Sequence, residues 1–149
     1  MLKALLATDG RLPAFVLRLF LAVVLFPHGA QKVLGWLGGP GLPAAINMMT
    51  TKMHIPLPFA ILAIAAEFLG PIGLFFGFLT RVAAFGIAVE MVVAILLVHL
   101  KFGFFMNWFG QKAGEGFEYH LLMIGMCIAL MISGGGVCSI DRAITRDRR

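Results

Sequence analysis

Three charged side chains stand out because each lies inside a long apolar stretch of the chain: Arg18, Glu67 and Glu90. If these stretches cross a membrane, each charge costs about 2.5–3.5 kcal/mol or more, and it needs a partner, a wet cavity or a function. An arginine can pair with a carboxylate through two parallel hydrogen bonds. If two carboxylates share one arginine, one carboxylate has no full partner. That group can carry a proton or polarise a ligand.

The spacing along the chain predicts a similar depth for all three charges. Arg18 precedes His28, near the end of the first stretch, by ten residues, which is about 15 Å of helix. Glu67 lies ten residues after Leu57, and Glu90 lies nine after Arg81. We therefore predict that Arg18 meets the two glutamates near the middle of the membrane. Two interpretations are open. The three charges could form a buried polar contact that only fixes helix packing, or they could form a proton-carrying or ligand-binding site.

A second group of polar side chains is expected at the membrane surface. His28 lies near the end of the first stretch, His99 ends the third and His120 opens the fourth. Imidazoles that meet there could bind a transition metal, hold a quinone carbonyl or form interfacial hydrogen bonds. Glu90 and His99 are nine residues apart, about half a turn around an ideal helix. This spacing argues against a metal site built from all three histidines.

The composition of the chain indicates a membrane protein. Of its 149 residues 60% are hydrophobic and only 13% are charged. A soluble globular protein has about 45–50% apolar residues, glycine included, so here too few polar residues remain to cover a surface in water. The net charge of +5 comes from loops and from the tail. It forms no basic face away from the apolar stretches, which argues against nucleic-acid binding.

Four apolar stretches have the length of about 20 residues that a membrane-spanning helix needs. Their apolar residues run continuously and do not alternate with polar ones, which favours helices over the strands of a barrel. The predicted fold is all-α: a polytopic membrane protein, with an antiparallel bundle of four transmembrane helices in one domain of residues 1–149. The spans cover about 12–33, 57–79, 81–100 and 117–137, followed by a basic tail at 141–149.

Four crossings would place both termini on the same side of the membrane. The basic residues outside the spans are more numerous on that side, which the positive-inside rule assigns to the cytoplasm. We therefore expect an inner (plasma) membrane protein with both termini cytoplasmic. The two groups are Lys3, Arg11, Arg81, Arg142, Arg146, Arg148 and Arg149 on the terminal side, and Lys32, Lys52, Lys101 and Lys112 on the other.

With these residues located, the sequence from Arg18 to Asp141 resembles the DoxX family of small four-helix membrane proteins. The order and spacing of five short motifs carry the resemblance, although Gly135 stands where proline is common in the family. The resemblance implies a subunit associated with quinol-oxidising and thiosulfate–quinone oxidoreductase complexes, or a membrane partner of thiol and oxidant-defence systems. The motifs are His28-Gly29-Ala30-Gln31-Lys32, Glu67-Phe68-Leu69-Gly70, Gly77-Phe78-Leu79-Thr80-Arg81, Glu118-Tyr119 and the ending at residues 134–141.

Three functions are open on this basis. The leading one is a subunit of a membrane redox system that contacts quinone or supports an oxidoreductase complex; its partners would be the lipid bilayer and other redox subunits or a second copy. If it is an enzyme, it acts as an oxidoreductase subunit with a partner. The alternatives are a small proton or solute transporter that uses the midplane carboxylates, and a purely structural subunit. The candidate residues are Arg18, Glu67 and Glu90 to anchor or protonate the ligand, and His28, Lys32 and His120 at its outer mouth.

Overall fold

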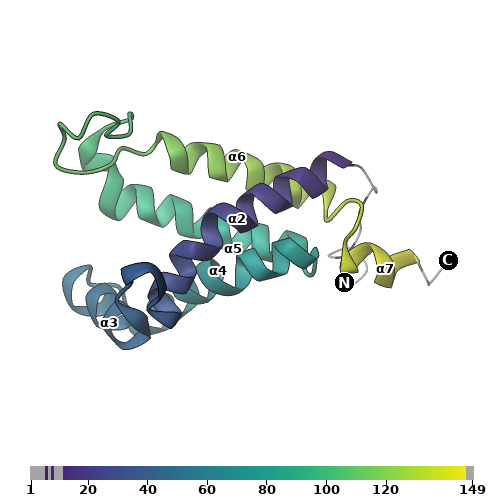
Figure 1. Ribbon diagram of the computed structural model, residues 1–149, viewed down its shortest axis with the longest axis horizontal. Helices are drawn as coiled ribbons and strands as arrows, with labels where there is room; N and C mark the ends of the chain where they lie inside the picture. The colour runs from purple at the N-terminus through teal and green to yellow at the C-terminus, as the bar shows by residue number, and fades with distance from the viewer. Residues whose placement is uncertain (1–5, 7, 9–11, 147–149) are drawn as a thin grey trace.

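The computed structural model describes residues 6, 8 and 12–146 of the chain. Every regular element in these residues is a helix, so the predicted all-α class is confirmed. Four of the helices form the body of the molecule, as Figure 1 illustrates. They are α2 (Leu12–Leu34), α4 (Leu57–Phe76), α5 (Thr80–Ala94) and α6 (Glu118–Ser133).

The four helices pack around one apolar core. The helix α2 lies along α4, α4 along α5 and α5 along α6, while α2 also touches α6. Gly29 of α2 approaches Glu67, whereas Arg18 reaches Leu74, so α2 and α4 run antiparallel. The largest fully buried apolar side chains of the core come from all four helices: Leu21, Leu25, Leu74, Ile87, Met123 and Leu130.

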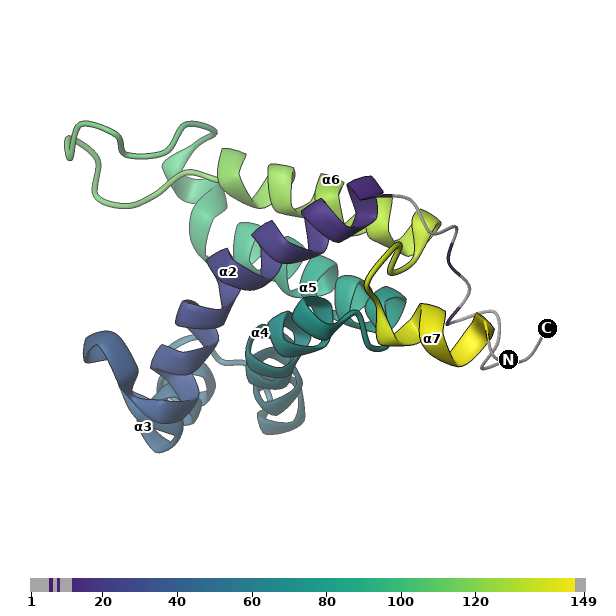
Figure 2. The same ribbon diagram turned by 45° about the vertical axis from the view of Figure 1, so that its right-hand side comes forward.

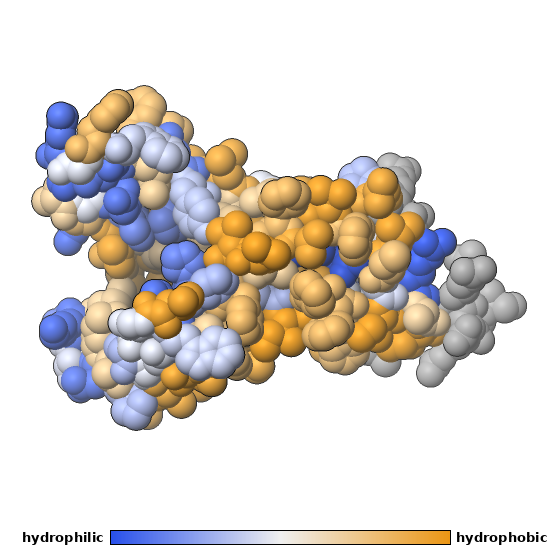
Figure 3. All heavy atoms as spheres, in the orientation of Figure 1, coloured by the Kyte–Doolittle hydropathy of each residue, from blue (hydrophilic) through white to orange (hydrophobic). Residues whose placement is uncertain are grey.

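Three helical segments are long and apolar enough to cross a membrane: Leu12–Leu34, Leu57–Phe76 and Thr80–Phe102. Hydrophobic surface covers the middle of the helices (Figure 3), as expected where lipid replaces water. The chain is therefore a membrane protein. The helix α6 is apolar as well but has only 16 residues, so the fourth crossing stays a prediction.

The third of these segments is not a uniform α-helix. After Ala94 the chain forms a wider π turn, η3 (Ile95–His99), and then a 3-10 turn, η4 (Leu100–Phe102). Single π turns inside helices are rare and are frequent at functional sites. This turn changes the angle at which His99 leaves the helix.

The connections gather at the two ends of the bundle. At one end lie α3 (Gly41–Asn47), its neighbours η1 (Trp36–Gly38) and η2 (Met48–Lys52), and the loop at residues 103–117. At the other end lies α7 (Ile140–Arg146), at the same end of the bundle as the start of α2 (Figures 1 and 2). The start of the first and the end of the last described helix thus lie at one end of the bundle, as an even number of crossings requires.

Candidate functional site

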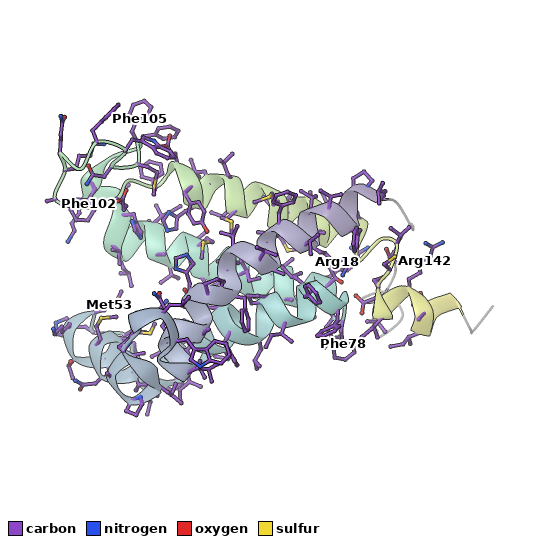
Figure 4. All side chains as sticks on the ribbon, viewed as in Figure 1. Arg18, Met53, Phe78, Phe102, Phe105 and Arg142 are labelled. Carbon is purple, nitrogen blue, oxygen red and sulfur yellow. The ribbon has the colours of Figure 1, made fainter. Side chains whose placement is uncertain are left out.

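Arg18 lies at the end of the bundle that carries α7, and its predicted pairing with Glu67 or Glu90 is wrong. Its side chain is 1% exposed. Figure 4 shows it at the same end as Phe78 and Arg142. Its guanidinium donates hydrogen bonds of 2.7–3.2 Å to five backbone carbonyl oxygens, those of Leu74, Phe75, Gly135, Val137 and Cys138.

The register of α2 against α4 explains this position. The helix α2 continues past His28 to Leu34, and Arg18 is level with Leu74 in the last turn of α4. Carbonyl groups in the last turn of a helix have no partner within the helix and carry a partial negative charge. The five donors of a guanidinium suit such a set of acceptors. Arg18 therefore joins the end of α4 to the turn that follows α6.

Asp141 completes this end of the bundle, and its role was missed by the sequence analysis. Its side chain is 1% exposed. The two carboxylate oxygens accept hydrogen bonds from the backbone N–H groups of Leu79 and Thr80 at 2.8 and 2.9 Å. A carboxylate at this place satisfies the unpaired N–H groups and the positive end of α5. Asp141 lies far along the chain from α5, and no local pattern connects the two.

Glu67 pairs with Lys32. The Nζ atom of Lys32 forms an ion pair with Oε2 of Glu67, and the two side chains are 29% and 8% exposed. Gly29, one turn before Lys32, lies against the backbone of Glu67. Residues three apart share a face of a helix, so this close approach brings Lys32 to the carboxylate. Lys32 is therefore the cationic partner of Glu67, a role that was predicted for Arg18.

The carboxyl group of Glu67 in α4 and that of Glu90 in α5 lie close enough to interact directly. An ionised carboxylate only accepts hydrogen bonds, so the two groups can bond to each other only when one of them holds a proton. The Oε2 atom of Glu90 is buried and has no hydrogen-bond partner within the described part of the chain. Two neighbouring carboxyl groups with a lysine beside one of them can, as acid–base chemistry, hold and release a proton.

Tyr119 and His120 of α6 extend this group of side chains. Tyr119 is close enough to Glu67 to interact with it electrostatically. Its ring lies 5.4 Å from that of His120, which lies 4.1 Å from the ring of His99. The Tyr119 hydroxyl and Nδ1 of His120 are buried, and among residues 12–146 neither has a hydrogen-bond partner. Since buried polar atoms are normally paired, they can receive hydrogen bonds from a ligand or from water. We call Lys32, Glu67, Glu90, His99, Tyr119 and His120 the polar cluster.

The three histidines predicted to converge do so only in part. His99 meets His120, and its Nδ1 atom lies 2.9 Å from the carbonyl oxygen of Glu115. In an ideal helix His99 would point about half a turn away from Glu90. Because the wider π turn Ile95–His99 changes this angle, His99 contacts α6. His28 is exposed on α2. The described residues include no group of three or more His, Cys, Asp or Glu that could hold a metal ion.

Comparison with known proteins identifies the family. The DoxX family model matches residues 14–100, a range that contains Lys32, Glu67, Glu90 and His99. The chain is 30% identical over 125 residues to an "Uncharacterized protein" of Haemophilus influenzae, covering 84% of this chain and 85% of that one. It is 26% identical over 134 residues to the "Putative oxidoreductase CatD" of Bacillus subtilis, covering 90% and 88%. No solved structure matches. The chain belongs to the DoxX family.

Proposed function

We propose that the chain is a membrane subunit of an oxidoreductase system and that the polar cluster binds the head group of a quinone. The observation that carries the proposal is that three of the four buried polar side-chain atoms without hydrogen-bond partners among the described residues belong to the polar cluster: Oε2 of Glu90, the Tyr119 hydroxyl and Nδ1 of His120. A quinone offers two carbonyl oxygens, and a quinol offers two hydroxyl groups. The similarity to a protein named as an oxidoreductase supports a redox role.

The carboxyl pair would serve proton exchange in this reaction. A quinone takes up two electrons and two protons when it becomes a quinol. The electrons would come from a partner oxidoreductase subunit, because the cluster consists of acid–base groups. One of the two protons would pass through Glu67 and Glu90, whose carboxyl groups lie close together, and Lys32 would stabilise the carboxylate that remains when this proton leaves.

Quinone binding to the purified protein in lipid nanodiscs tests the proposal. Replacing Glu90→Gln or His120→Gln should weaken binding about 5- to 30-fold, the effect of one lost hydrogen bond in a buried site. The matched control is His28→Gln, because His28 is exposed on α2 and lies outside the polar cluster. Unchanged binding in both cluster variants would contradict the proposal.

A transporter is the second candidate, because the carboxyl pair beside Lys32 could also bind a coupling ion. Reconstituted vesicles separate the two. Proton or solute flux without a redox partner, abolished by Glu90→Gln, would favour transport. Quinone-dependent electron transfer with a co-purified partner would favour the redox function. If neutral replacements of Glu67 and Glu90 changed only stability, the cluster would be structural.

We further propose that the protein lies in the inner (plasma) membrane with α6 as the fourth crossing and both termini in the cytoplasm. The position of α7 at the same end of the bundle as the start of α2 supports this arrangement (Figure 1). Cys138 is exposed at this end, whereas Cys127 is buried. A membrane-impermeant thiol reagent should therefore label Cys138 in inside-out vesicles and not in intact cells, and Cys138→Ser should abolish the labelling.

A further inference from the structure

The polar cluster extends from one end of the bundle toward its middle. Lys32 lies in the last turn of α2, and Tyr119 and His120 lie in the first turn of α6. All three are therefore near the end that carries α3 and the loop at residues 103–117, which we call the α3 end. Glu67 lies deeper, ten residues after the start of α4, which is about 15 Å of helix. The cluster thus joins the surface of the membrane to the inside of the bundle.

Lys32 connects the buried carboxyl pair to the α3 end. Its side chain is 29% exposed, and its Nζ atom forms the ion pair with Glu67, whose side chain is 8% exposed. The carboxyl group of Glu67 in turn lies close to that of Glu90. A lysine near the end of a membrane helix extends its ammonium group toward water, and Figure 3 shows hydrophilic residues at this end. Lys32 can therefore meet water on one side and the carboxyl pair on the other.

Apolar side chains separate the carboxyl pair from the opposite end of the bundle, the α7 end. Beyond the cluster, each of the four helices contributes side chains that are at most 2% exposed: Leu21 and Leu25 of α2, Leu74 of α4, Ile87 of α5, and Met123 and Cys127 of α6. Leu74 lies seven residues after Glu67, about 10 Å along the helix. Close-packed apolar side chains hold no water and no group that can pass a proton. The carboxyl pair is therefore closed toward the α7 end.

The chemistry of lysine suits a proton carrier at this place. Lysine can lose its charge in a protein interior, so an ammonium group can give a proton to a neighbouring carboxylate and the amine can then take another from water. Arginine can form the same ion pair but keeps its proton in proteins. We propose that the carboxyl pair exchanges its proton with water only at the α3 end and that Lys32 carries this proton.

Each proton on this route has a donor and an acceptor. The ammonium group of Lys32 gives its proton to the carboxylate of Glu67, and the amine that remains takes a proton from water at the α3 end. A proton that leaves the carboxyl pair is thereby replaced, and the reverse steps release one. The route itself requires no quinone, whereas its use in the quinone reaction rests on the proposed function.

Exchange of the carboxyl proton for deuterium tests the role of Lys32. Rapid mixing of the protein in lipid nanodiscs with D2O should shift the infrared C=O band of the protonated carboxyl group, which is identified by its loss in the Glu67→Gln, Glu90→Gln double variant. Lys32→Arg should keep the ion pair and the thermal stability but slow this shift about 100-fold, the usual effect of losing a positioned proton carrier.

Lys52→Arg is the matched control, because Lys52 is an exposed lysine of η2 at the same end. It should exchange as fast as the wild-type protein. Equal rates in Lys32→Arg and the wild-type protein would overturn the role of Lys32. If no band of a protonated carboxyl group is lost in the double variant, the pair holds no proton and the proposal is wrong.

Thiol labelling in sealed vesicles tests the direction of the route. In a Cys138→Ser background, Lys32→Cys combined with Glu67→Gln places a thiol at the α3 end and leaves no carboxylate at position 67. A membrane-impermeant reagent should label position 32 from the side opposite to that on which the exposed Cys138 of the wild-type protein reacts. Cys127, which is buried in the apolar layer, should react from neither side. Labelling of Cys127 from the Cys138 side, or no labelling of position 32 from the opposite side, would overturn the proposal.

These tests fail separately from the proposed function, because neither contains a quinone. If they fail, the route is wrong, and quinone binding to the polar cluster is still decided by the nanodisc experiment. If they succeed and no quinone binds, the proposed function is wrong, while the one-sided proton route of the carboxyl pair remains.

Discussion

Gly29 of α2 lies directly against the backbone of Glu67 in α4. A Cβ atom at position 29 would lie 2.7 Å from the carbonyl carbon of Glu67 and from the Cα atom of Phe68. Both are backbone atoms, which no side-chain rotation can move away. Glycine is needed at this position because it allows two backbones to approach closely, as small residues do between membrane helices. The contact fixes the register in which Lys32 reaches Glu67.

Replacing Gly29→Ala should therefore separate α2 from α4. We expect the free energy of unfolding to fall by about 1–3 kcal/mol, the usual effect of overpacking. Thermal or steric-trap unfolding in detergent measures it. Gly125→Ala in α6 is the matched control, because a Cβ atom there meets open space and alanine should leave stability unchanged or slightly raised. Equal losses in the two variants would show that the contact with Glu67 does not matter.

The ion pair of Lys32 and Glu67 should appear as coupling in a double-mutant cycle. Lys32→Met alone leaves a buried carboxylate without its partner, so its destabilisation should exceed that of the same change in a Glu67→Gln background. We expect a coupling of about 1–3 kcal/mol. Lys52→Met, at an exposed lysine of η2, controls for the loss of one positive charge. Additive effects of the two replacements would contradict the pairing.

The sequence predicts the helices well because the apolar stretches are long and continuous. The first predicted span, 12–33, agrees with Leu12–Leu34 almost to the residue. The partner of Glu67 was not predictable in the same way. Arg18 and Lys32 lie on the same face of α2, and only the register against α4, set at Gly29, decides which of them meets the carboxylate.

Two other features depend on contacts that a one-dimensional pattern does not contain. The π turn Ile95–His99 changes the angle between Glu90 and His99, and no residue in that apolar run marks it. Asp141 binds the start of α5 across more than 60 residues of chain, whereas capping residues are normally sought next to their own helix. Both follow from packing in three dimensions.

Arg18 should act on stability and leave quinone binding unchanged. Arg18→Lys keeps the charge but offers at most three donors to the five carbonyl oxygens. We expect a loss of about 2–4 kcal/mol in the free energy of unfolding, because buried carbonyl groups remain unpaired. Arg142→Lys at the same end, where the side chain is half-buried, should change it by less than about 0.5 kcal/mol. If the Arg18→Lys protein folds but binds quinone more weakly, Arg18 contributes to the quinone-binding site.

Removing the carboxylate of Asp141 should loosen the first turn of α5. Asp141→Ala leaves the N–H groups of Leu79 and Thr80 without their acceptor. The expected loss is about 1–2 kcal/mol, the usual cost of a lost helix cap. Hydrogen exchange should become faster at these two amides first, while amides of the middle of α6 keep their protection. Unchanged exchange at Leu79 and Thr80 would contradict the capping role.

Tyr119 offers the clearest separation of function from stability. Its buried hydroxyl has no hydrogen-bond partner within the described part of the chain, and a buried unpaired polar group costs about 1–3 kcal/mol. Tyr119→Phe should therefore leave the free energy of unfolding unchanged or raise it by up to about 1 kcal/mol, while quinone binding weakens about 5- to 30-fold. A group that is kept at a cost to stability is typical of a functional site. If Tyr119→Phe destabilised the protein and left quinone binding intact, the hydroxyl would have a structural partner, and the polar cluster would lose one of the three atoms on which its function rests.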